Sequence, residues 1–133
     1  MSAPRDCPCH SGLRYRACCG PLHDGVREAE TPEALMRSRY AAFARGLGAY
    51  LVRTLAADHP DRAQDEAALV VALSRAKDTQ RFLGLTILDS QVDGDRGEVT
   101  FHARIFERGA DRSFTERSRF VREPGGWKYA GGS

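Results

Sequence analysis

The sequence predicts an α+β fold, in which helices pack on one face of a curved antiparallel sheet and a small N-terminal knuckle precedes them. Apolar residues recur at helical spacing between residues 31 and 76, and they alternate with polar residues at strand spacing after residue 82. Helices followed by an antiparallel meander are typical of this class. The four cysteines of the chain, all within residues 7–19, predict the knuckle.

The chain is expected to divide between residues 30 and 31. Its 133 residues fit one ordinary domain with a small appendage. Residues 31–133 are numerous enough to bury a hydrophobic core. Residues 1–30 are too few to form a core of their own, so they need a cross-link such as a metal ion. We therefore expect a zinc knuckle and linker over 1–30 and an α+β domain over 31–133.

The cysteine spacing predicts one tetrahedral metal site. Cys7 and Cys9 form one close pair and Cys18 and Cys19 form a second, and together they supply four thiolates, which zinc binds at about 2.3 Å each. Disulfides within either pair would be strained. Four thiolates leave no open position for water, so we expect one structural Zn²⁺ at these four cysteines rather than a catalytic one.

In the knuckle, Ser11 is placed to cap a helical turn over Gly12–Ala17, with Cys18 and Cys19 at its end. Gly20-Pro21 is expected to stop this turn. Residues 24–30 are polar and charged, and they predict a solvated linker.

Three helices are predicted next. Thr31, Pro32 and Glu33 supply an N-cap, a first-turn proline and a first-turn acid. The apolar face of this first helix is expected to comprise Met36, Tyr40, Phe43 and Leu47, with Gly46 and Gly48 ending or bending it. A short second helix is expected to contain Tyr50, Leu51, Thr54 and Leu55. A third is expected over Gln64–Ala76, with Ala68, Leu69, Ala72 and Leu73 as its apolar face.

Four strands are predicted after the helices. The β-rich run Leu83–Leu88 leads to a hairpin turn at Asp93–Gly97. A second strand alternates apolar residues, Val99, Phe101, Ala103 and Ile105, with Thr100, His102, Arg104 and Phe106. A third is expected over Ser113–Arg122, and a short final strand contains Trp127 and Tyr129.

The charge balance excludes one class of function. The chain has 20 Lys and Arg against 18 Asp and Glu, so it lacks the basic excess of a general nucleic-acid binder. No run is apolar enough for a signal peptide or a membrane span. Reduced thiols without an export signal predict a cytoplasmic protein.

The segment from Cys7 to Gly20, CPCHSGLRYRACCG, resembles the SEC-C zinc motif, named for the C-terminal tail of the SecA translocase motor. The stretches 20–23, 35–43 and 116–120 and the terminal Trp127-x-Tyr129 resemble the YchJ family of bacterial proteins. That family's middle domain is similar to the nuclear-transport-factor-like, cystatin-related cone fold, so the resemblance implies this fold for residues 31–133.

The resemblance also places the family's metal ligands at Cys7, Cys9, Cys18 and Cys19. His10 stands where the motif usually has glycine. Two consequences are open: the turn after Cys9 is less free, or His10 competes as a ligand.

For function, the resemblance implies a protein-interaction or adaptor role, since the SecA tail contacts protein partners and the ribosome. The partner-binding candidates are His10, Arg14, Tyr15 and Arg16, expected around the outside of the knuckle. The alternative is that the knuckle only braces the N-terminus. Contact with ribosomal RNA through the two arginines, and a homodimer through the open face of the sheet, also remain open.

The runner-up function is a small-molecule binder or weak enzyme that uses the pocket of the cone. The pocket candidates are Arg39, Tyr40, His102, Arg104 and Glu116. His102 beside a carboxylate suits acid–base work, but a solvent-facing histidine is the simpler interpretation. No Gly-x-Ser-x-Gly elbow or phosphate-binding loop is found, and the cysteines are assigned to the metal. We therefore name no catalytic residue and do not expect an enzyme.

Overall fold

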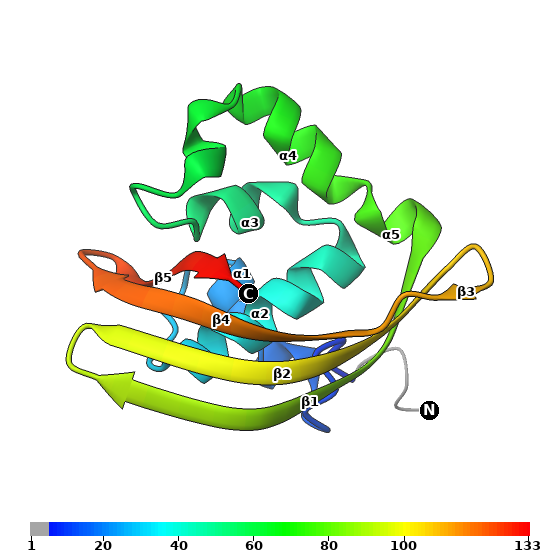
Figure 1. Ribbon diagram of the computed structural model, residues 1–133, viewed down its shortest axis with the longest axis horizontal. Coiled ribbons are helices and arrows are strands. Elements are labelled where there is room, and N and C mark those ends of the chain that lie inside the picture. The colour runs from blue at the N-terminus through cyan, green and yellow to red at the C-terminus, as the bar shows by residue number, and fades with distance from the viewer. Residues whose placement is uncertain (1–5) are drawn as a thin grey trace.

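A computed structural model, which describes residues 6–133, has helices packed on one face of a curved antiparallel sheet (Figure 1). The predicted α+β class is confirmed. The helices are α1 (Gly20–His23), α2 (Pro32–Arg45), α3 (Gly48–Arg53), α4 (Glu66–Ser74) and α5 (Ala76–Thr79), with 3₁₀ turns at Tyr15–Ala17 and Pro60–Ala63. The strands are β1 (Gln80–Asp93), β2 (Arg96–Glu107), β3 (Ala110–Asp111), β4 (Phe114–Glu123) and β5 (Gly126–Gly132).

Helix α2 begins and ends as its sequence predicts. The Thr31 side chain accepts a hydrogen bond from the Ala34 amide at 3.0 Å, and Pro32 fills the first turn. Gly46 ends the helix with φ +74°, a left-handed conformation that favours glycine. Leu47, expected on this helix, therefore lies beyond its end.

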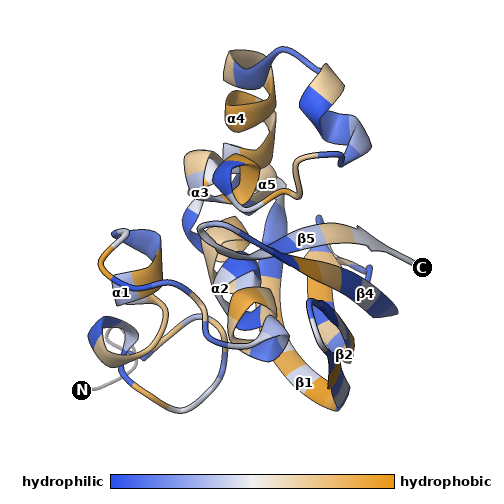
Figure 2. Cartoon of the chain, turned by 90° about the vertical axis from the view of Figure 1, so that its left-hand side faces the viewer, coloured by the Kyte–Doolittle hydropathy of each residue, from blue (hydrophilic) through white to orange (hydrophobic). Residues whose placement is uncertain are grey.

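The central position of α2 was not predicted. Leu35, Met36 and Tyr40 pack in the core against the sheet, whereas Ala41 packs against three of the cysteines. Ala42 packs against α3. In Figure 2, α2 lies between α1, α3 and the strands, so the single apolar face predicted from spacing is too narrow.

The sheet has the order β1-β2-β4-β5, with β3 paired to the end of β2. The predicted hairpin turn is confirmed, because Asp93 pairs with Arg96 and Gly94 has φ +62°. The predicted alternation of β2 is confirmed as well: Val99, Phe101, Ala103 and Ile105 are buried against the helices. β-Bulges in β1, on either side of residues 84–87, accompany its curvature.

Strand β5 is joined to the end of α3. The Tyr129 amide donates to the Thr54 carbonyl, and the Ala56 amide donates to the Tyr129 carbonyl, both at 2.8 Å. These bonds hold the helical layer over one end of the sheet.

Three further local predictions are corrected. Gly20-Pro21 begins α1 instead of ending a helix, because a proline in the first turn is compatible with a helix start. Within the expected turn over Gly12–Ala17, only Tyr15–Ala17 is helical, as a 3₁₀ turn.

The third correction concerns α4, which is capped by the Asp65 side chain and begins at Glu66, two residues after the expected start. Its inward residues are Leu69, Val70 and Leu73, whereas Ala68 and Ala72 are exposed. Apolar residues lie on all sides of this short helix, EAALVVALS, so their spacing alone does not identify the face that points inward (Figure 2). Within residues 6–133, no helix has the length and apolar character needed to cross a bilayer.

Replacing Leu35 by alanine is expected to lower the free energy of unfolding by about 2 to 5 kcal/mol, because Leu35 is 2% exposed and packs between α2 and the sheet. Leu88→Ala is the matched control: Leu88 is 57% exposed, and the expected change is within about 0.5 kcal/mol. Urea denaturation followed by circular dichroism measures both. Equal losses would contradict the assigned core.

Candidate metal centre

A tight turn positions the first pair of cysteines. The His10 amide donates to the Cys7 carbonyl at 3.1 Å, which closes the turn through Pro8 and Cys9. The Cys7 amide donates to the Leu13 carbonyl at 2.9 Å, so the chain folds back on itself as in a hairpin. Both sulfurs are thereby held on the inner side of this loop, where Cys7 and Cys9 are buried.

The 3₁₀ turn and α1 position the second pair. The Cys18 amide donates to the Tyr15 carbonyl at 3.0 Å, and α1 begins directly after Cys19. A Cβ at Gly20 would lie 2.9 Å from the Tyr15 carbonyl oxygen, so only glycine fits there. We use "the knuckle" below for residues 6–23, which comprise the turn, the 3₁₀ turn and α1.

The four sulfur atoms lie within 4.8 Å of one another. The Cys9–Cys18 and Cys18–Cys19 sulfur separations are 3.6 and 3.9 Å. Four thiolates arranged tetrahedrally around zinc lie about 3.8 Å apart, given bonds of about 2.3 Å. The cysteines are free thiols, and both separations are much longer than the S–S bond of a disulfide, which is about 2.05 Å. The cluster is thus suited to hold one metal ion.

Hydrogen bonds among the cysteines shift the pKa values of Cys9 and Cys19 in opposite directions. Hydrogen bonds from the Cys19 and Cys7 sulfurs lower the pKa of Cys9, while hydrogen bonds to Cys7 and Cys9 raise the pKa of Cys19. A divalent metal binds cysteines as thiolates and would displace their protons. The Ser11 hydroxyl lies 3.2 Å from the Cys18 sulfur and adds an outer hydrogen bond to the ligand set.

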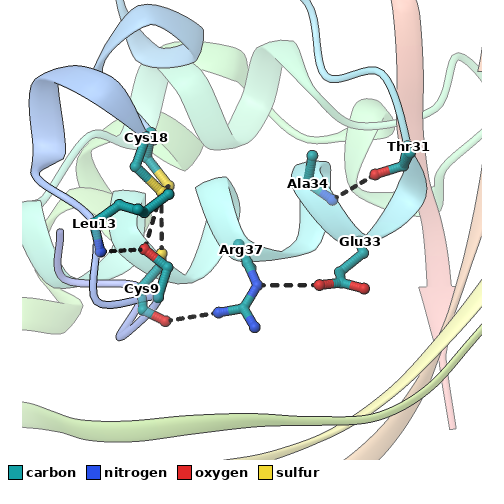
Figure 3. A network of polar contacts seen from close by, with 9 residues as sticks. Cys9, Leu13, Cys18, Thr31, Glu33, Ala34 and Arg37 are labelled. Carbon is teal, nitrogen blue, oxygen red and sulfur yellow. Dashed lines mark hydrogen bonds and ion pairs between the residues drawn. The ribbon is translucent and has the colours of Figure 1, made fainter.

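The knuckle is attached to α2. Ala41 packs directly against the cysteine cluster. Arg37 donates from Nη1 to the Cys9 carbonyl at 3.3 Å, and its Nε pairs with Glu33 at 3.3 Å (Figure 3). Arg37 thus links the metal loop to the first turns of the helix.

His10 contacts the sheet rather than joining the sulfur cluster. Its φ is +63°, in the left-handed region that favours glycine, and histidine is one of the residue types that tolerate this region. The His10 Nε2 donates to the Phe82 carbonyl at 3.1 Å, and its ring meets the edge of Tyr40. The group of atoms that could hold a metal comprises the four sulfurs and not this ring.

Tyr15 and His23 form a second link to α2. His23 donates from Nε2 to the Ser38 carbonyl at 2.8 Å, so its Nδ1 accepts from the Tyr15 hydroxyl at 2.6 Å. Burial lowers the pKa of His23 and keeps the ring neutral at pH 7. The guanidinium of Arg45 lies over the Tyr15 ring at 4.1 Å.

The residues expected on the outside of the knuckle therefore differ in their surroundings. Arg14 and Arg16 are exposed, next to Leu13, which is 55% exposed. His10 is exposed but bonded to β1, and Tyr15 is half-buried against α2.

The pocket candidates are separated by the sheet. Arg39, Tyr40 and Glu116 line a cavity between α2 and the sheet. His102 and Arg104 alternate with the buried residues of β2 and so lie on the opposite face, where the His102 ring bonds Thr115. The strand register explains this correction, because Glu116 pairs with Phe101 while His102 pairs with Thr115.

Sequence reasoning missed the two side chains that attach the knuckle. The sequence offers one indication for Arg37, because it follows Glu33 by one helical turn and can pair with it. His23 lies one helical turn after Cys19, at the end of α1. From this position its side chain reaches α2.

Comparison with known proteins identifies the family. A family model described as YchJ, middle NTF2-like domain, matches residues 31–132, and the SEC-C motif matches residues 6–21. A UPF0225 protein from Deinococcus radiodurans is 42% identical over 94% of this chain and 86% of its own length. The UPF0225 protein YchJ from Shigella dysenteriae is 40% identical over 96% of this chain and 82% of its own.

Solved structures agree with this assignment. The solution structure of a SEC-C motif containing protein from Rhodopseudomonas palustris superposes with a TM-score of 0.81 at 39% identity, covering 96% of each chain. The crystal structure of another, from Psychrobacter arcticus, gives 0.76 at 27% identity, covering 94% of this chain and 80% of that one. The chain belongs to the YchJ (UPF0225) family, and its domain has the expected NTF2-like fold.

Replacing Cys9 by serine is expected to abolish stoichiometric metal binding, because it removes a wholly buried ligand from the centre of the cluster. Metal per chain is measured by mass spectrometry of the native protein. Leu13→Ser, an exposed change in the same loop, is the control and should keep one metal per chain. Full metal content in the Cys9 variant would contradict the four-sulfur site and point to His10 as a substitute.

The neutral His23 makes stability depend on pH. Its pKa is lowered in the folded chain, so the unfolded chain binds the proton first as the pH falls through about 6.5. This contribution is complete above that pH and is lost toward the folded-state pKa. Arg45 and Arg53 oppose protonation of the ring, and Asp24 favours it. In His23→Gln, the stability lost between pH 7 and 5.5 in urea denaturation should be smaller; equal losses would contradict this role.

Proposed function

We propose that this YchJ-family chain binds one structural zinc ion at Cys7, Cys9, Cys18 and Cys19 and uses the metal-bound knuckle as a protein-interaction element. The observation that supports zinc is the set of four converging sulfurs at near-tetrahedral separations. We propose further that residues 1–30 form the knuckle and linker, and residues 31–133 the domain that holds it.

The choice of zinc follows from the donor chemistry. Four thiolates in a tetrahedral arrangement suit zinc, which forms closed structural sites of this type. Bound there, the ion would supply a cross-link between the two cysteine pairs and no reactive position. The protein's own part is to hold the sulfurs in place, through the turn at Cys7 and the Arg37 bond to the Cys9 carbonyl.

The interaction role is supported by the division of the knuckle into two sides. The side that contains Tyr15 and His23 is occupied by contacts with α2. The other side has an exposed leucine, Leu13, and two exposed arginines, Arg14 and Arg16. A partner with an apolar recess surrounded by acidic side chains is complementary to this surface.

The same contacts favour a bracing role, so the two roles must be separated by the outer side chains and not by deleting the knuckle. Deletion would expose Ala41 and remove both roles together. We propose the cytoplasm as the location, because a zinc tetrathiolate requires cysteines that remain reduced.

The test compares zinc-loaded wild type with the triple variant Leu13→Ser, Arg14→Ser, Arg16→Ser as bait in a bacterial lysate. Proteins bound by wild type and lost from the variant, at unchanged zinc content, are the expected result. The control variant Arg81→Ser, Leu83→Ser removes an exposed arginine and an exposed leucine from β1 and should capture as wild type does.

Identical capture by wild type and the triple variant would contradict the interaction role and leave the knuckle as a brace. Ribosome contact has its own signature in the same experiment. Cosedimentation with ribosomes through these arginines would weaken steeply between about 50 and 200 mM salt if RNA phosphates were bound. A flat salt response would exclude RNA contact and indicate a ribosomal protein.

A further inference from the structure

The cavity between α2 and the sheet lies away from the cysteine cluster and has a volume of about 350 Å³. This volume is within the range of small-molecule sites. Its walls are mainly apolar, and aromatic side chains line it from both layers, among them Tyr40, Phe82, Phe101, Phe114 and Phe120. A flat apolar molecule therefore meets ring faces and edges on several sides.

A buried positive charge, the Arg39 guanidinium, lies in this apolar lining. The Arg39 side chain is 8% exposed and enters the cavity from α2. Its Nη1 donates to the Leu51 carbonyl at 2.8 Å and to the Thr54 hydroxyl at 2.6 Å, and its guanidinium lies over the Tyr129 ring at 4.6 Å. Burial lowers the pKa of Arg39 to about 10, so the side chain stays charged at neutral pH.

Arg39 lacks a carboxylate partner. Among residues 6–133, no Asp or Glu oxygen lies within 4.0 Å of its guanidinium. Nη1 donates both of the hydrogen bonds described above. A buried charge is stabilised most by an opposite charge in hydrogen-bond contact. The acid in the cavity lining, Glu116, accepts at Oε2 from the Ser118 hydroxyl at 2.6 Å and from the Tyr129 hydroxyl at 3.1 Å.

A second cation lies at the cavity's most exposed end. Arg112, just before β4, and Phe114, its first residue, are both exposed and line the cavity. With Arg39 inside, Arg112 at this end and Glu116 on the wall, the lining has one positive charge in excess. This excess favours an anion over an amine, for which Glu116 would be the only charged acceptor in the lining.

We propose that this cavity binds a small apolar monocarboxylate, with its carboxylate on the Arg39 guanidinium and its ring or chain against the aromatic walls. The Arg39 Nε and Nη2 groups supply the donors, and Arg112 favours entry of the anion. This site is independent of the metal centre and of the partner surface around Leu13.

The test uses three probes that share one ring and one chain length: 3-phenylpropionate, 3-phenylpropanamide and 3-phenylpropylamine. Each is titrated into the full metal-loaded chain, and binding is followed by amide and methyl chemical shifts in NMR. The carboxylate is expected to shift resonances of the cavity residues and to bind at least about tenfold more tightly than the amide, the difference that one charge-assisted hydrogen bond supplies.

Two variants assign the anion contact. Arg39→Met keeps the apolar stem and removes the charge, and it should reduce carboxylate affinity to that of the amide. Arg104→Met makes the same change on the opposite face of the sheet and should bind as wild type. If Arg39→Met does not fold, the three-probe comparison on wild type still decides.

Three results would overturn the proposal. Equal affinity for carboxylate and amide would exclude recognition of the charge. Preference for the amine would transfer recognition to Glu116. Absence of shifts at the cavity residues with millimolar carboxylate would show that the cavity is only a packing defect of the core.

Discussion

The contact between the cysteine cluster and Ala41 is the constraint on which the rest of the structure depends. The residue at this position has a single methyl group and is wholly buried, so the loop containing Cys7 and Cys9 can approach the α2 backbone closely. A bulkier side chain would push the loop outward and break the Arg37 bond to the Cys9 carbonyl. The metal loop and α2 are therefore held together by this close packing contact, while Leu35, Met36 and Tyr40 pack α2 against the sheet.

Helix α2 connects the two sites of the molecule. Arg37 faces the knuckle, Ser38 accepts from His23 through its carbonyl and bonds Tyr50 through its hydroxyl, and Arg39 faces the cavity. Three successive residues thus point in three directions, toward the knuckle, α3 and the cavity. A helix surrounded in this way has no solvent-facing stripe in its middle turns, and this explains why polar residues such as Ser38 and Arg39 are buried there.

The features predicted correctly from the sequence are those with local causes. The cysteine spacing predicts that the four sulfurs converge as a group that could hold a metal ion, Thr31 and Pro32 start α2, and alternation along β2 identifies its buried face. Some errors concern contacts that join distant segments, and others concern the limits of short helices. Alternation already separates His102 from Phe101, but the placement of Glu116 required the register of β2 against β4. Gly20-Pro21 is compatible with either end of a helix, and only the packing of Gly20 on Tyr15 decides between them.

The bond from His10 to the Phe82 carbonyl has a consequence for self-association. Strand β1 is one edge of the sheet, and an unpaired edge is a template for adding a strand from another molecule. At residues 82–84 the backbone of β1 is already occupied, by the His10 ring and by the Tyr40 hydroxyl, which donates to the Gly84 carbonyl and accepts from its amide. Side chains from the cysteine loop and α2 thereby protect this part of the edge, so an invading strand would pair with β1 beyond Gly84, toward Asp93.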